Sequence, residues 1–107
     1  MWSVEFLDEK VLEEMQDQPK DIKARFERIV QLIINNGLER VREPYVKHLE
    51  DKLWEMRMKG KDTIARAIYV TAIEKRIIIL RVFTKKTQKT PRREIAIALQ
   101  RAKEITS

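Results

Sequence analysis

The sequence predicts an α+β domain with an antiparallel-rich mixed sheet, an N-terminal helical hairpin and a C-terminal helix. Two observations carry this prediction. Apolar residues recur at helical spacing within residues 22–33 and 95–105, whereas period-two alternation and apolar runs occupy residues 53–83. The chain has 107 residues, of which 43% are hydrophobic, and no internal repeat or low-complexity linker divides it. We therefore expect one domain, spanning residues 1–107, with a modest core.

The N-terminal part predicts a short strand followed by two helices. Residues 2–7 hold β-type side chains, and the acidic residues 8–16 predict a helix that ends before Pro19. A second helix should end at Gly37, because glycine accepts positive φ. Its apolar stripe is a core face or, alternatively, a groove for a protein partner. The stripe consists of Ile22, Phe26, Ile29, Val30 and Ile33.

The second half predicts three strands and a last helix. Residues 38–52 are polar and predict a loop, and strands should cover residues 53–59, 64–73 and 77–83. In the first of these strands, apolar and charged residues alternate, which is typical of one buried face. Thr90 can cap the last helix, with Pro91 in its first turn and Glu94 near its positive end. The apolar face of that helix is Ile95, Ala98, Leu99, Ala102 and Ile105.

The composition excludes several kinds of site. The chain has no cysteine, which excludes disulfides, thiol catalysis and cysteine-rich zinc sites. Its single histidine, His48, excludes an all-histidine metal site, and we expect neither metal nor cofactor. The N-terminus lacks the features of a signal peptide, and no apolar run approaches the roughly 20 residues of a membrane helix. We expect a soluble cytoplasmic protein without membrane association.

The charge is distributed unevenly. Residues 1–44 carry 7 basic and 10 acidic residues, whereas residues 45–94 carry 14 basic and 6 acidic ones. Within the second part, the cationic segment (residues 84–93) holds five cations and no acid. It lies between a predicted strand and a predicted helix, where a cationic loop can hold phosphates. This distribution favours a polyanionic partner, with a merely solvated basic face as the alternative.

Three segments resemble the RelE/ParE toxin superfamily, and most closely its phage-related HigB branch. They are KHLEDKLWEMR at 47–57, RAIYV at 66–70 and FTKKTQKTPRREI at 83–95. The last is similar to a branch signature, F-x-K-K-T-x-K-T-P-x-x-E-I. Two departures stand out: Glu50 and Lys52 occupy positions where the branch often has glycine, and no tyrosine follows Tyr69, whereas RelE has a catalytic one near its C-terminus.

The resemblance implies a small RelE-like fold and a toxin of a type II toxin–antitoxin system. Such a toxin, encoded by a bacterium, phage or prophage, is neutralised by a cognate helix-turn-helix (HigA-like) antitoxin. Many members cleave messenger RNA on the translating ribosome without a metal and thereby inhibit translation. We therefore expect a ribosome-dependent mRNA endoribonuclease whose partners are the antitoxin, mRNA and the ribosome.

Metal-free RNA cleavage by the ribose 2′-hydroxyl needs a base, charge stabilisation and a proton for the leaving oxygen. By the resemblance, Arg57 binds the scissile or a neighbouring phosphate, and Arg66 stabilises charge in the transition state. The alternatives are an exposed Arg57 paired with Glu55 and a cross-strand salt bridge of Arg66. Lys85 and Lys86 are candidates for proton transfer, because crowded cations favour a neutral amine; each is alternatively a phosphate anchor.

The evidence that other residues belong to the same site is weaker. His48 or Glu55 is a possible base, and Glu55 alternatively orients Arg57; a lone histidine in a loop is more often incidental. Trp54 and Tyr69 either stack on RNA bases or pack in the sheet. Five cations are expected to bind messenger or ribosomal phosphates at longer range, or to be solvated: Lys59, Lys61, Lys89, Arg92 and Arg93.

Two other functions fit the same residues. A ParE-like DNA gyrase inhibitor would share the sheet and helices, but its cationic residues would be dispensable. Toxicity retained after Arg66→Ala together with Lys86→Ala favours that function. A non-catalytic nucleic-acid-binding module predicts strong salt dependence without cleavage. For the nuclease, we expect Arg57→Ala and Arg66→Ala each to abolish growth arrest with the fold intact.

Overall fold

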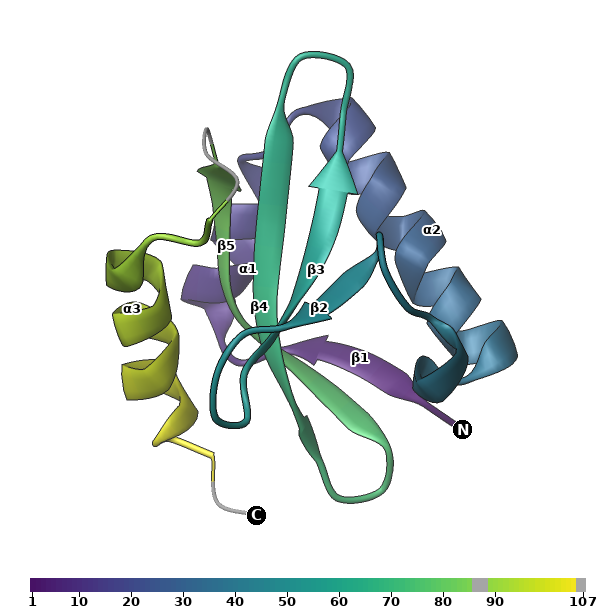
Figure 1. Ribbon diagram of the computed structural model, residues 1–107, viewed down its shortest axis with the longest axis vertical. Coiled ribbons are helices and arrows are strands. Elements are labelled where there is room, and N and C mark those ends of the chain that lie inside the picture. The colour runs from purple at the N-terminus through teal and green to yellow at the C-terminus, as the bar shows by residue number, and fades with distance from the viewer. Residues whose placement is uncertain (86–88, 106–107) are drawn as a thin grey trace.

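In the computed structural model, which describes residues 1–85 and 89–105 and only the backbone of Lys85, helices flank a five-stranded sheet (Figure 1). The described elements follow in chain order. They are β1 (Ser3–Phe6), α1 (Glu9–Gln16), α2 (Lys20–Asn36), the 3-10 helix η1 (Leu38–Arg40), β2 (Val46–His48), β3 (Trp54–Lys59), β4 (Ile64–Ala72), β5 (Arg76–Lys85) and α3 (Arg92–Ala102). The α+β class, the helical pair and the C-terminal helix are confirmed, consistent with a small RelE-like fold.

The sheet is mixed, as predicted, and has the order β1-β5-β4-β3-β2. Among the described strands, only β1 and β5 pair in parallel, from Ser3 opposite Arg76 to Phe6 opposite Ile79. The other neighbours are antiparallel. Because β1 ends there, none of the described strands lies on the outer side of the second half of β5. The pairing of β4 with β5 also shifts by one residue, which places a bulge at Leu80.

The helix ends follow from local chemistry. The Asp8 side chain caps α1 by accepting a hydrogen bond from the backbone nitrogen of Val11 (3.1 Å). Pro19 precedes the first residue of α2, where its missing N–H costs nothing. Gly37 ends α2 with φ 88°, the positive value that favours glycine, and its N–H donates to Ile33 (2.8 Å).

Two apolar clusters lie on opposite faces of the sheet. The α1/α2 face buries the predicted stripe of α2, so the core interpretation of that stripe is confirmed over its buried members, Ile22, Phe26, Ile29 and Ile33. The α3 face buries Ile95 and Ala98 against Ile68, Val70, Ile78 and Leu80. Figure 1 shows α3 on one side of the sheet, with α1 and α2 on the other.

Three local expectations are refined or corrected. The polar segment predicted to be loop-rich also contains two short elements, η1 and β2. The helix α3 begins after Pro91 without a side-chain cap, because the hydroxyl of Thr90 donates to Glu55 instead. The alternation in β3 does not separate core from solvent, since Trp54 is 38% exposed while Glu55 is 0% exposed. Both faces of this strand are covered in part, so neither set of alternating residues faces only water.

Candidate functional site

Arg57 and Arg66 lie side by side on one face of the sheet. They are cross-strand partners on β3 and β4. Their chain neighbours are buried in the core under α1 and α2. Because successive side chains of a strand point to opposite faces, both arginines belong to the α3 face. Both arginines lie in the halves of their strands nearer the β3–β4 turn. Figure 1 shows that this hairpin extends beyond α3.

Arg66 is almost completely buried, with 3% of its surface exposed, and forms an ion pair with Glu55. Burial lowers the pKa of Arg66; the charge of Glu55 raises it and the charge of Arg57 lowers it, and the net shift is downward. The structure therefore contains the cross-strand salt bridge that was the alternative for Arg66. Truncating Arg66 would break this pair and leave a buried carboxylate, so we expect Arg66→Ala to destabilise the fold as well as to abolish growth arrest.

Arg57 has a different environment. It is half-buried and forms no ion pair or side-chain hydrogen bond with any described residue. Its expected alternative partner, Glu55, is bonded to Arg66 and to Thr90 instead. An arginine without a carboxylate partner keeps its planar set of donors for an external anion. Of the two strand arginines, Arg57 is the one whose guanidinium is available to a phosphate.

Glu55 joins three segments of the chain. It is fully buried, and its Oε2 accepts a hydrogen bond from the hydroxyl of Thr90 at 2.6 Å, while Oε1 faces the guanidinium of Arg66. Thr90 itself is 6% exposed. Neither of the two functions considered from the sequence, a general base or a partner of Arg57, matches these contacts.

Two more expected cations belong to the same end of the sheet. Lys59 on β3 and Lys85 on β5 both pair with Ile64 of β4, one from each side. Lys59 and Ile64 are exposed, and Lys61 is exposed in the turn after β3. The side chain of Lys85 and the whole of Lys86 lie outside the described residues, so their proposed chemistry stays a prediction.

The remaining cations lie at the start of α3. Lys89, Arg92 and Arg93 are exposed. Arg92 forms an ion pair with Glu50, which raises the pKa of Arg92 and lowers that of Glu50 through their hydrogen bond. Glu50 stands where the branch often has glycine, so this departure supplies a partner for Arg92. A solvent-exposed pair of this kind stabilises a fold only weakly.

The two aromatic candidates, Trp54 and Tyr69, and the histidine lie on the other face of the sheet. His48 pairs with Trp54 across β2 and β3, their ring centroids are 4.9 Å apart, and Trp54 belongs to the face opposite Glu55. Tyr69 is 1% exposed in the core under α1 and α2, where burial raises the pKa of its phenol. The packing interpretation of Tyr69 is confirmed, and His48 is placed on the face away from the arginines.

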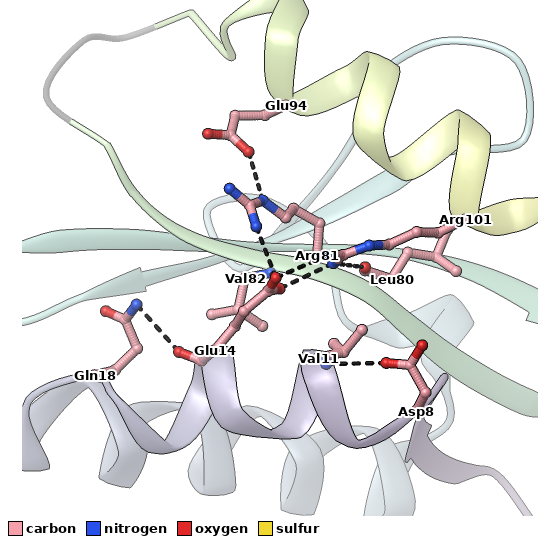
Figure 2. Close-up of polar contacts among 9 residues, drawn as sticks. All are labelled: Asp8, Val11, Glu14, Gln18, Leu80, Arg81, Val82, Glu94 and Arg101. Atoms are coloured by element: carbon pink, nitrogen blue, oxygen red, sulfur yellow. Dashed lines mark hydrogen bonds and ion pairs between the residues drawn. The ribbon is translucent and has the colours of Figure 1, made fainter.

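Sequence reasoning missed a charged cluster at the outer side of β5 (Figure 2). Glu14 of α1 accepts from Arg81 (2.7 Å), from Arg101 of α3 (3.0 Å) and from the backbone nitrogen of Val82 (3.1 Å). Arg81 also donates to Glu94 (2.6 Å). The signal was present in the sequence, since Arg81 interrupts the apolar run of β5, but its partners come from helices at both ends of the chain.

The ionisation of Glu14 reflects this cluster. Burial alone would raise the pKa of Glu14, but the hydrogen bonds from Arg101 and Val82 and the charges of both arginines outweigh it, so the pKa lies below its ordinary value. Both helical layers are therefore joined around β5 by charge-assisted hydrogen bonds. They fix α3, and with it one end of the cationic segment, relative to the sheet.

The described residues offer no metal site and no membrane-spanning helix. Within residues 1–85 and 89–105, no group of three His, Cys, Asp or Glu side chains is placed to hold a metal ion. None of the helices in the same residues is long and apolar enough to cross a membrane.

Fold and site together define a small α+β protein with a cationic end on one sheet face. A family model described as Phage derived protein Gp49-like (DUF891) matches residues 13–103, and the chain belongs to this family. The Gp49-like family is one of RelE/HigB-like toxins of toxin–antitoxin systems. A search of curated proteins gives no match.

Proposed function

We propose that this protein is the toxin of a type II toxin–antitoxin system and, more specifically, a HigB-like, metal-independent endoribonuclease that cleaves mRNA on the ribosome. The observation that carries the proposal is the half-buried Arg57, which has no ion-pair partner among the described residues and lies beside a second arginine at the cationic end of the sheet. Membership of the Gp49-like family supports the toxin assignment.

In the proposed reaction, the ribose 2′-hydroxyl loses its proton to a base and its oxygen attacks the adjacent phosphorus. The bond from phosphorus to the 5′-oxygen of the next nucleotide breaks, and that oxygen takes up a proton. Arg57 binds the phosphate oxygens, and the positive charge of Arg66 adds stabilisation as negative charge develops. Lys85 or Lys86 supplies the proton transfer or anchors the phosphate.

The exposed cations extend this site. Lys59 and Lys61 lie near the β3–β4 turn, and Lys89, Arg92 and Arg93 lie at the start of α3. We propose that they bind phosphates of the messenger or the ribosome, which makes association dependent on salt. We also propose that a helix-turn-helix, HigA-like antitoxin neutralises the toxin.

The test is induction in a bacterial host, with mapping of new 5′ ends on transcripts. We expect cuts inside translated frames that vanish when translation is blocked. Efficient cleavage of purified RNA without ribosomes would contradict the dependence on translation. Growth arrest with intact transcripts would overturn the nuclease and direct attention to a protein target such as DNA gyrase, and salt-dependent RNA binding without cleavage would indicate a binding module.

A further inference from the structure

The contacts of Glu55 define a connection between the strand arginines and the cationic segment. A buried carboxylate is costly unless its oxygens are bonded, and both oxygens of Glu55 have partners. One partner, Arg66, lies directly opposite Arg57 in the sheet. The other, Thr90, is the residue before Pro91, at the point where the cationic segment enters α3. Glu55 therefore connects β3, β4 and that segment.

Two residues of the cationic segment, Lys85 and Thr90, are held by neighbouring strands. The backbone of Lys85 pairs with Ile64 on β4. The hydroxyl of Thr90 is held by Glu55 at 2.6 Å. The contact of Thr90 with Glu55 therefore places Lys89 and the first residues of α3, Arg92 and Arg93, relative to the strand that carries Arg57.

We propose that Glu55 is a positioning residue of the RNA site, which acts through Arg66 and Thr90 and sets the position of Arg66 relative to Arg57 and to the start of α3. This inference rests on the proposed nuclease function. It excludes Glu55 as the base, because its two oxygens are occupied by Arg66 and Thr90 inside the fold. Misplacement of reacting groups by about 1 Å can cost roughly 100-fold in rate, so the effect should fall on the chemical step.

The cleanest variant is Thr90→Val, which keeps the volume of the side chain and removes only the hydroxyl that Glu55 holds. Glu55→Gln tests the same contact but leaves Arg66 buried opposite a neutral group, and therefore threatens the fold. Thr90→Ser restores the hydroxyl. Matched controls are Thr71→Val, at an exposed position near the far end of β4, and Glu5→Gln, which removes the exposed partner of Arg76.

The measurement is single-turnover cleavage of mRNA on purified, programmed ribosomes, with the maximal rate and the half-saturating ribosome concentration determined separately, and with thermal unfolding in parallel. We expect Thr90→Val to lower the maximal rate by about 10- to 100-fold. Its half-saturating concentration should stay near wild type. Its unfolding midpoint should fall, because one oxygen of the buried Glu55 loses its partner, so the rate is measured well below that midpoint. Thr90→Ser should recover most of the rate. Both controls should cleave like wild type.

A wild-type rate in Thr90→Val would overturn the assignment while leaving the nuclease intact. The assignment would also be overturned if the loss of rate followed loss of folded protein, or if Thr90→Ser did not restore it. Wild-type protein that leaves ribosome-bound mRNA uncut would overturn the proposed function first, and the positioning role with it. The wild-type assay therefore separates the two failures.

Discussion

The two faces of the sheet are built from the same strands but differ in how far their apolar surface extends. Under α1 and α2, the alternate residues of β3 and β4 remain apolar along the strands, with Met56, Met58, Ala65, Ala67 and Tyr69 all buried. On the α3 face, Ile68 and Val70 are apolar, but Arg66 and Arg57 follow toward the β3–β4 turn.

This difference shows where folding and function place separate demands on one sheet. The α1/α2 face contributes burial, at about 25 cal/mol per Å² of apolar surface removed from water. Near the β3–β4 turn, the α3 face instead buries an ion pair and has a second arginine, Arg57, beside it. Residues that depart from the apolar pattern of a sheet face without a gain in stability are expected at functional sites. Four substitutions test this contrast, ordered by their expected effect on the free energy of unfolding.

Arg66→Ala should have the largest effect, because it removes one partner of a buried ion pair. We expect a loss of about 3–5 kcal/mol in the free energy of unfolding, measured by urea denaturation. A double-mutant cycle with Glu55→Ala supplies the control, since the second change should cost much less once the first has been made. Additive costs in the cycle would show that the two side chains do not stabilise the fold through each other.

Ile29→Ala tests the apolar face. Ile29 is a residue of α2 and is fully buried in the core between that helix and the sheet. Its truncation should cost about 2–5 kcal/mol through lost burial and the remaining cavity. Ribosome-dependent cleavage by the remaining folded protein should be unchanged. A loss of cleavage in fully folded protein would contradict the separation of the two faces.

Glu14→Gln tests the cluster that joins the helices across the sheet. We expect a loss of about 1–3 kcal/mol at neutral pH, because two mostly buried arginines lose a charged acceptor. The pKa of Glu14 is lowered in the folded state, so its stabilisation is fully present above the ordinary value of 4.5 and is lost as pH falls through the folded-state pKa.

The stability difference between wild type and Glu14→Gln should therefore shrink below about pH 4.5. Denaturation curves at a series of pH values measure it, and Glu9→Gln, in the exposed first turn of α1, is the matched control. A difference that stays constant down to strongly acidic pH would show that the charge of Glu14 does not contribute.

Arg57→Ala should have the smallest effect on stability and a large one on activity. Its charge opposes that of Arg66, so its removal should change the free energy of unfolding by no more than about 0.5 kcal/mol. Growth arrest should be abolished. The control is Arg28→Ala on the exposed side of α2, which should remain toxic. Toxicity of Arg57→Ala at equal soluble expression would remove Arg57 from the site.

Most of the fold could be predicted from the sequence, because the helices and long strands carry their own periodic signals. The stripe of α2 and the apolar run of β5 are examples. The strand β2 could not, since only Val46 of its three residues is buried and so short an edge strand has no period. The fold class and the order of the longer elements therefore needed no tertiary information.

The site was less predictable because its geometry depends on tertiary contacts. The sequence placed Arg57 and Arg66 on strands, but which of them would be buried depends on what lies opposite. Alternation in β3 suggested that Glu55 faces solvent. In the structure, Thr90, which precedes α3, and Arg66 of β4 bond to its carboxylate. Spacing along one strand carries no information about that enclosure.

The charged cluster beside β5 also bears on how this molecule avoids aggregation. Beyond Ile79, no strand of the described residues lies on the outer side of β5, and such an edge invites pairing with another chain. Glu14 occupies the N–H of Val82, and Arg101 donates to the carbonyl oxygen of Leu80 at 2.8 Å. A foreign strand could add here only by displacing these ion-paired side chains. The interruption of the apolar run at Arg81 thus also protects the longest strand of the sheet from edge-to-edge association.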